Sequence, residues 1–385
     1  MDSQPGKSGG RSNVLDALRA VAILLVLGRH AEVSELWTRI GWCGVDLFFV
    51  LSGFLISGLL FQEYKRVGNI CLKTFWLRRG LKIYPAFYVC TLVQTLVYIL
   101  LFGKLLGTKV VFHRFLIDAT FLSSYFEGVS GHVWSLAVEE HFYFLLPVFL
   151  LVLMKVRGKR PGKTEDPFSS VPFVFLLIAA VSLVLRMVAR PASFSEYYSY
   201  LLPTHLRMDG LFCGVTVGYL FHFKPELLAR WARWPMLVAG IVLLTPVYYL
   251  NVEYWHMYTW GLTCTFLGFA CVMTWAIHLP FRKNHLLALP INLLARIGFY
   301  SYSIYLWHWM IFFYLRPYIR FRCMKTGSPF AWSSAMEHGQ WLFCIASSIL
   351  VGVAMAVIIE QPALKLRDRW FPSRTRQLKA AAATA

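Results

Sequence analysis

The segment LDALRAVAILLVLGRHA, residues 15–31, decides the fold of this chain. It is apolar enough to enter a membrane, yet it carries Asp16 and Arg19 near one end and Arg29 and His30 at the other. Arg19 and His30 are eleven residues apart, which in an α-helix corresponds to about three turns and about 16 Å. The two side chains therefore share one face at different depths, and only an elongated ligand would contact both. Because ionisable groups inside a membrane helix are costly, they indicate a functional site.

A structural explanation of the same charges stays open. Arg29 stands at the end of the apolar run, where a long side chain can snorkel to the membrane surface. Asp16 precedes Arg19 by three residues, so the two can neutralise each other on one helix face.

The composition of the whole chain indicates a membrane protein. Of its 385 residues, 58% are hydrophobic and 15% are charged, whereas a soluble protein has about 25% charged residues. The net charge of +19 would suit nucleic acid, but the basic residues lie in short loops between apolar runs, so no nucleic-acid partner is expected. The eight cysteines are scattered without a CxxC pair. We therefore expect neither a disulfide framework nor a zinc site. The sequence contains no Walker loop, dinucleotide fingerprint or HExxH motif, and no bound cofactor or metal is expected.

Apolar runs of about 20 residues predict an all-α integral membrane protein, a polytopic bundle of about ten transmembrane helices. The loops on one side of these runs hold 25 Lys and Arg residues and those on the other side hold eight. The positive-inside rule then places both termini in the cytoplasm. We expect a cytoplasmic segment over 1–13, one membrane domain over 14–369 and a disordered basic tail over 370–385. The predicted spans are 14–31, 43–62, 83–103, 133–154, 171–189, 204–222, 234–251, 259–279, 297–316 and 341–359.

Polar residues near the outer ends of the first two spans predict a histidine–carboxylate pair. Asp46 lies three residues into the second span, at nearly the depth of His30. A carboxylate there would hold the imidazole in one tautomer and stabilise its charged form.

Three cations stand close together before the third span, in the segment FWLRRGLKIYP. Arg78, Arg79 and Lys82 fall within about one helical turn, which suits a phosphate or pyrophosphate group. Ordinary anchoring to anionic membrane lipids explains the same residues equally well.

The fourth span begins with GHVWSLAVEEHF and brings two acids into a membrane helix. Helical spacing predicts that His132, Ser135 and Glu139 share a face, an arrangement suited to general acid–base chemistry on a hydroxyl. Glu140 points elsewhere, and we expect it to pair with an internal arginine, Arg186 or Arg207.

Two further groups lie deep in later spans. Arg207 and Asp209 stand near the outer entry of the sixth span, and because they are two residues apart they should serve different neighbouring helices. His308 lies near the middle of the ninth span between two tryptophans. It is either a functional group or a neutral histidine that donates one hydrogen bond in a packed core.

Seven segments in chain order carry a family resemblance. They are LDALRA followed by His30, GVDLFFVLSGFLIS, RRGLKIYP, HVWSLAVEEHFYFLLP, RMDGLFCG, SYSIYLWHW and IEQP. From about residue 13 to residue 369 the chain resembles the acyltransferase-3 family of integral membrane acyltransferases. The resemblance implies about ten helices and the transfer of acyl groups to hydroxyls, usually on sugars. Acceptors in that family include surface polysaccharides, lipid-linked glycans and macrolides.

The resemblance also implies roles for particular residues. Arg19 and His30 match the family's Arg-x10-His pair, and Glu139 matches its Trp-Ser-Leu-x-x-Glu acid. Arg79 matches the first arginine of its Arg-x-x-Arg motif, but Lys82 stands in place of the second. Lysine keeps the charge and loses the bidentate fork that favours phosphate.

These observations together predict a membrane O-acyltransferase. Acyl-coenzyme A is the expected co-substrate, docked from the cytoplasm on Arg78, Arg79 and Lys82, with Arg19 guiding it inward. His30 is the expected general base, oriented by Asp46 or Glu139, and an acyl-histidine intermediate stays open. The acceptor is a carbohydrate, glycolipid or macrolide. Other residues expected on the acceptor side or along a pore are Ser135, Arg207 and His308.

Two other functions are compatible with the same sequence. A transporter or flippase of a lipid-linked or acylated compound would also place polar groups at both ends of a bundle. A structural or receptor-like bundle fits less well, because several titratable groups lie within the spans. In each case the protein contacts membrane lipids and is expected in the bacterial inner (cell) membrane.

Overall fold

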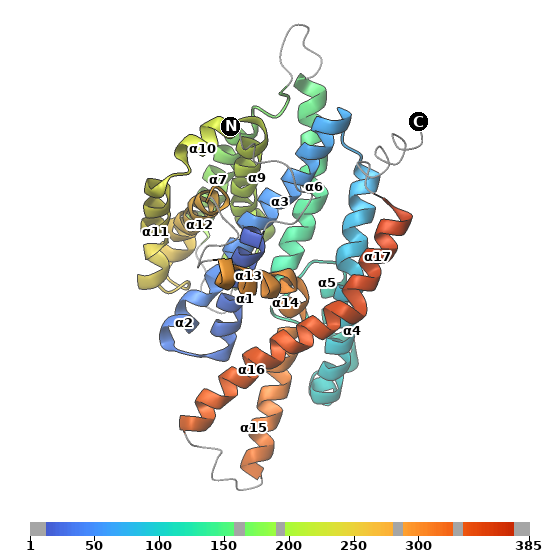
Figure 1. Ribbon diagram of the computed structural model, residues 1–385. Helices are drawn as coiled ribbons and strands as arrows, with labels where there is room; N and C mark the ends of the chain where they lie inside the picture. The colour runs from blue at the N-terminus through green and yellow to red at the C-terminus, as the bar shows by residue number, and fades with distance from the viewer. Residues whose placement is uncertain (1–12, 158–165, 190–196, 280–287, 326–333, 373–385) are drawn as a thin grey trace.

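The computed structural model describes residues 13–157, 166–189, 197–279, 288–325 and 334–372, and over these residues it is built from helices without a β-strand (Figure 1). The α-helices are α1 Asn13–Ala31, α2 Glu35–Ile40, α3 Gly44–Val67, α4 Leu72–Leu106, α5 Thr108–Ala119, α6 Trp134–Arg157, α7 Val171–Val188, α8 Tyr197–Tyr200, α9 Met208–Phe223, α10 Pro225–Trp231, α11 Trp234–Tyr249, α12 Leu262–Ile277, α13 Ala288–Phe299, α14 Ser301–Met310, α15 Arg316–Lys325, α16 Ser334–Met355 and α17 Gln361–Trp370. The short 3₁₀ segments are η1 Gly41–Cys43 and η2 Thr204–Leu206. The π-helical segments are η3 Met257–Gly261, η4 Ile311–Leu315 and η6 Ala356–Glu360.

The helices confirm an all-α membrane protein. Within the described residues, six helices are long and apolar enough to cross a membrane, and α10 with α11, bent by 71°, forms a seventh candidate. A helix has formed at each of the ten predicted spans. Some of these helices are short, such as the 16-residue α9, or charged, such as α1 with Asp16, Arg19 and Arg29. The number of crossings and the side of each terminus stay predictions, and most of the segments 1–13 and 370–385 lie outside the described residues.

Helix α1 lies inside the bundle. In Figure 1 it occupies the middle of the molecule, between the group α7, α9, α11 and α12 and the group α4, α6 and α17. It packs against α3, α12, α13, α14 and α16, and its residues Ala20, Ala22, Ile23 and Leu27 are fully buried. By contrast, α7 exposes Phe173, as expected of a helix that faces lipid. The residues of α1 are therefore placed to line internal cavities.

Small residues allow α3 and α9 to approach closely. A Cβ atom on Gly53 would lie 3.1 Å from the Cα atom of Gly214 and would meet the carbonyl of Leu211. A Cβ atom on Gly214 would meet the backbone of Val50 and Phe54. These glycines form a packing seam that lets the two helix backbones approach closely, and the seam holds α3 beside α9.

Candidate active site

Three cavities follow one another through the bundle, and most of the residues selected from the sequence line them. We name them the basic cavity, the middle cavity and the histidine cavity. The free space at each, including the part open to solvent, is about 1300 Å³ for the basic cavity, about 850 Å³ for the middle cavity and about 1140 Å³ for the histidine cavity.

The basic cavity gathers cations from three helices. Arg78 is held there by the carboxylate of Asp368, 3.0 Å away, and donates to the carbonyl of Phe371. This contact ties α4 to the end of α17, so the arginine is paired in the absence of a ligand. The cationic residues that line the cavity are Arg66, Arg78, Arg79, Lys82 and Arg367.

The middle cavity lies next to the basic one, because Arg79 and Lys82 line both. The guanidinium of Arg79 lies 4.0 Å from the ring centroid of Tyr143, which orients it along the wall between α4 and α6. Arg19 also lines this cavity, and its guanidinium is 3.2 Å from Asp16, the neutralising pair that the sequence left open. Other polar residues on the wall are Ser52, Ser135, Glu139, Glu140 and Glu360.

Glu139 is held firmly in the middle cavity. One oxygen accepts from the hydroxyl of Ser52 at 2.6 Å and the other from the hydroxyl of Tyr143 at 2.5 Å. Ser135 faces the same cavity, as predicted, but His132 precedes the first residue of α6 and lines the histidine cavity instead. The predicted shared face of three residues is therefore wrong for His132.

The histidine cavity contains His30 at the C-terminal end of α1, together with His132, Trp309 and Arg207. The His30 ring lies 5.3 Å from the ring of His308 and 5.6 Å from that of Trp309. His308 is fully buried behind His30. The sequence placed His308 deep in the membrane but did not predict that three imidazoles would gather, because they come from helix ends far apart in the chain.

Two side chains separate the middle cavity from the histidine cavity. Val45 and Tyr305 line both. The Tyr305 hydroxyl donates to the carbonyl of His132 at 2.8 Å and lies 2.7 Å from the hydroxyl oxygen of Ser135. Tyr305 was not selected from the sequence, although its position three residues before His308 puts it on the same face of α14.

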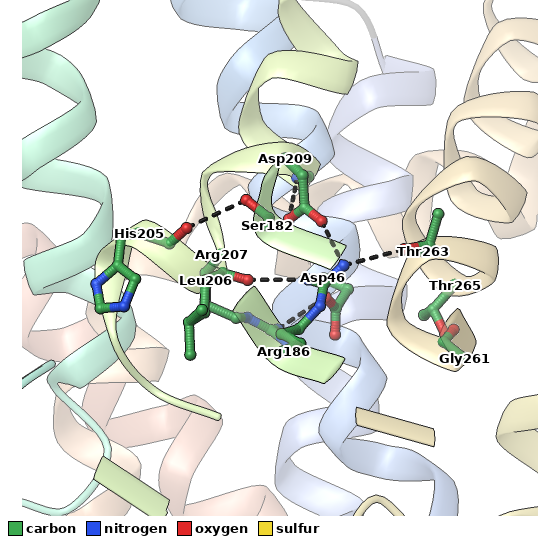
Figure 2. Close-up of polar contacts among 11 residues, drawn as sticks. Asp46, Ser182, Arg186, His205, Leu206, Arg207, Asp209, Gly261, Thr263 and Thr265 are labelled. Carbon is green, nitrogen blue, oxygen red and sulfur yellow. Dashed lines mark hydrogen bonds and ion pairs between the residues drawn. The ribbon is translucent and has the colours of Figure 1, made fainter. Parts of the chain in front are cut away.

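Two buried ion pairs beside the histidine cavity correct the prediction for Asp46. Its carboxylate accepts from Arg207 at 2.8 Å, and Arg186 lies 2.7 Å from Asp209 (Figure 2). All four side chains are at most 4% exposed. Asp46 therefore does not orient His30 in this structure, because a permanent cation beside a buried carboxylate is the stronger partner. Arg207 and Asp209 serve different helices, as their spacing predicted.

Arg207 reaches the cavity as part of this network. Its guanidinium lies 5.5 Å from the ring centroid of Phe49 and 5.7 Å from that of Trp134. An arginine held between a carboxylate and two aromatic faces has little freedom to move. It presents a fixed positive charge to the cavity.

Glu140 has a partner that the sequence did not predict. It accepts from the hydroxyl of Tyr84 at 3.2 Å rather than pairing with Arg186 or Arg207. Both arginines are already held by Asp209 and Asp46. Among the described residues, no group of three or more His, Cys, Asp or Glu side chains has the arrangement of a metal site.

The comparisons with known proteins agree with the resemblance seen in the sequence. Residues 13–357 match the model of an acyltransferase domain, the acyltransferase-3 family. The chain is 29% identical over 324 residues to a Staphylococcus aureus (strain COL) protein named as an O-acetyltransferase, covering 79% of this chain and 51% of that protein. No solved structure matches the chain.

Two further relatives have names that include an acceptor. The peptidoglycan O-acetyltransferase OatA of Listeria monocytogenes is 26% identical over 370 residues, 91% of this chain and 55% of that protein. A Bacillus subtilis protein, YrhL, also named as a peptidoglycan O-acetyltransferase, is 28% identical over 385 residues, 94% of this chain and 56% of that protein. The chain thus spans about half the length of these relatives. The match to the family model nevertheless covers nearly all of this chain, which therefore belongs to the acyltransferase-3 family and carries its acyltransferase domain.

Proposed function

We propose that this chain is a membrane O-acyltransferase. It would move an acetyl or another short acyl group from a cytoplasmic acyl-thioester to a hydroxyl of a carbohydrate-containing acceptor. The observation that carries the proposal is the series of three cavities, in which Arg79 and Lys82 join the first to the second and Val45 and Tyr305 join the second to the third.

The basic cavity suits the phosphates of coenzyme A. Five cationic side chains line it, and guanidinium and ammonium groups are the usual partners of phosphate. The excess of Lys and Arg in the loops on this side supports a cytoplasmic orientation. The thioester would then extend past Arg19 into the middle cavity, which brings its carbonyl carbon towards Tyr305 and the histidine cavity.

His30 is the proposed general base. The acceptor hydroxyl gives its proton to His30 while its oxygen attacks the thioester carbonyl carbon. The carbon–sulfur bond then breaks, and His30 returns the proton to the leaving thiolate, so that an ester and free coenzyme A result. A positioned base contributes roughly 10²–10⁴-fold to such a reaction, and the fixed charge of Arg207 would help hold the acceptor.

The acceptor is proposed to come from the outer side, where His30 lies under the predicted topology. Two relatives are named as peptidoglycan O-acetyltransferases, so a cell-wall glycan in a bacterial cell membrane is the first candidate. A glycolipid or a macrolide belongs to the same chemical class of hydroxyl acceptors.

The test is release of free coenzyme A, measured by mass spectrometry on membranes that contain the chain. Acetyl-, propionyl- and isovaleryl-coenzyme A are offered with a soluble peptidoglycan oligosaccharide, a glycolipid and a macrolide. We expect acceptor-dependent release that His30→Ala abolishes. The matched control is His113→Ala, which removes an exposed histidine on α5 and should keep wild-type activity.

Two outcomes would contradict the proposal. Full activity of a correctly inserted His30→Ala protein would exclude His30 as the base. Failure of the wild-type protein to turn over any thioester, together with movement of a labelled glycolipid across proteoliposomes, would favour a transporter.

A further inference from the structure

Among the described residues, no carboxylate is hydrogen-bonded to the ring of His30, although a carboxylate usually orients a catalytic histidine. One oxygen of Asp46 is paired with Arg207 and its other oxygen has no hydrogen-bond partner in the described residues, while both oxygens of Glu139 accept from hydroxyls in the middle cavity. A neutral imidazole without an orienting partner exists as two tautomers, and only one of them presents its lone pair to a substrate. Another group must therefore select the tautomer if His30 acts as a base.

His308 has the properties of such a group. Its Nδ1 lies 2.5 Å from the carbonyl oxygen of Tyr305. A carbonyl oxygen only accepts hydrogen bonds, so Nδ1 carries the proton and Nε2 carries a lone pair. The tautomer of His308 is thus determined by its own helix.

The second nitrogen of His308 is buried without a partner. Its Nε2 atom has no hydrogen-bond partner among the described residues, and the side chain is 0% exposed. A buried polar atom without a hydrogen bond costs free energy, and a catalytic role is one of the explanations for it. A buried lone pair is therefore available beside the candidate base.

Two imidazoles lie close enough to His308 to use that lone pair, and both ring nitrogens of His132 are themselves buried without a hydrogen-bond partner among the described residues. The imidazole of His30 lies 5.3 Å away at an interplanar angle of 37°, and that of His132 lies 5.0 Å away at 83°. The other ring contacts are to Tyr305, Trp309 and Phe312. A centroid separation of about 5.3 Å leaves room for one hydrogen bond with a nitrogen–nitrogen distance of about 3 Å when each imidazole points a ring nitrogen at the other.

We propose that His308 is the positioning residue of His30, with its buried Nε2 accepting a hydrogen bond from one ring nitrogen of His30. This inference rests on the proposed function. The bond leaves the other nitrogen of His30 free to take the hydroxyl proton, and the Nε2 lone pair stabilises the imidazolium that forms. His308 keeps its own Nδ1 proton throughout, and the transferred proton passes from His30 to the leaving thiolate.

Two amide variants separate this role from a structural one. The side-chain amide of asparagine reaches the position of Nδ1, and that of glutamine reaches the position of Nε2. His308→Asn therefore keeps a donor for the Tyr305 carbonyl but loses the acceptor towards His30, whereas His308→Gln keeps the acceptor.

We expect kcat of His308→Asn to fall about 10²-fold or more below the wild-type value. The kcat of His308→Gln should be at least tenfold higher than that of His308→Asn. The KM values for both substrates should stay within about twofold of wild type, since His308 lines neither substrate cavity. His141→Asn and His141→Gln are the matched controls, because His141 also has one ring-nitrogen partner, the Thr204 hydroxyl at 2.7 Å, and lies outside all three cavities. Both should show wild-type kcat.

A measurement without turnover checks the same proposal. ¹⁵N-imidazole NMR of histidine-labelled protein in lipid nanodiscs should show one tautomer for His30 in the wild type and a mixture in His308→Asn. It also reports whether each variant keeps the wild-type fold.

Equal kcat in the two His308 variants, or higher kcat in His308→Asn, would overturn the inference and leave the proposed function intact. So would an unchanged tautomer of His30 in a folded His308→Asn protein. A wild-type protein that transfers no acyl group would overturn the proposed function, and the inference with it.

Discussion

Adjacent arginines in the segment FWLRRGLKIYP have different surroundings. Arg78 is held by Asp368 and the carbonyl of Phe371, and of the three cavities it lines only the basic one. Arg79 lines both the basic and the middle cavity, and its guanidinium stacks on Tyr143. At the residue scale, the contacts of each arginine decide whether its charge is available to a ligand. The two arginines should therefore contribute differently to donor binding.

We expect Arg79→Gln to raise the KM for acyl-coenzyme A at least tenfold, because a hydrogen bond to a charged group contributes about 1.5–3 kcal/mol. Arg78→Gln should raise the KM for acyl-coenzyme A less than about fivefold, since the charge of Arg78 is already paired with the carboxylate of Asp368. Initial rates against donor concentration measure both. Equal effects would show that the two arginines bind the donor in the same way.

The buried Asp46–Arg207 pair makes a prediction about stability. Asp46→Ala leaves Arg207 buried without its ion-pair partner, which should lower the free energy of unfolding by about 3–5 kcal/mol. The control is Glu127→Ala, which breaks the ion pair between Glu127 and Arg114. The Glu127 side chain is 60% exposed, so this substitution should lower the free energy of unfolding by less than about 1 kcal/mol. Denaturant unfolding in detergent compares them, and similar losses would exclude a structural role for the buried pair.

At the scale of elements, helix α5 is joined to the loop after it by one carboxylate. The backbone N–H groups of Val129 and Ser130 donate to Asp118 at 2.8 and 3.1 Å. α5 is not among the helices long and apolar enough to span a membrane. Burial raises the pKa of the Asp118 carboxyl to about 7, although the two N–H groups act to lower it.

This pKa predicts how stability depends on pH. The folded state holds a proton between about pH 4 and pH 7 that the unfolded state has lost, so stability falls as pH rises through about 7. Between pH 5 and pH 7 the loss should be on the order of 2 kcal/mol. Asp118→Asn cannot titrate and should show a flatter profile in thermal unfolding at pH 5, 6, 7 and 8. An equal slope in both proteins would mean that another group titrates.

At the scale of the whole molecule, three cavities succeed one another because α1, α3, α4, α6 and α14 enclose a common interior. Val45 and Tyr305 stand where the middle and histidine cavities meet. A donor bound on the basic side and a hydroxyl bound beside His30 must meet at this point, so it should control transfer without controlling donor binding.

A bulky side chain at the junction tests this arrangement. Val45→Trp should lower kcat more than tenfold while the affinity for free coenzyme A stays within about twofold, because the phosphates of coenzyme A bind in the basic cavity, which Val45 does not line. The control is Val21→Trp on the exposed face of α1, where the valine side chain is 39% exposed. Binding of free coenzyme A by calorimetry and release of coenzyme A during turnover separate the two effects, and normal turnover in Val45→Trp would show that the acyl group takes another route.

The sequence by itself determined the class of fold, the places where ten of the helices form and the family. Runs of apolar residues and spacing along one helix are local properties, so they identified the helices and placed Ser135 beside Glu139 on one cavity wall. The motifs identified the acyltransferase-3 family because seven of them occur in chain order and in register with the predicted helices.

Only the tertiary structure decided which polar groups meet. Asp46 and His30 have nearly equal depth in the sequence, but rotation of α3 about its axis turns Asp46 towards Arg207, and depth alone does not specify rotation. His308 lies beside His30 although nearly 280 residues separate them in the chain, because the packing of α14 against α1 brings them together. Because buried charges take the strongest partner that packing brings within reach, partner choice depends on how α1, α3, α9 and α14 pack, and that packing is a property of the whole bundle.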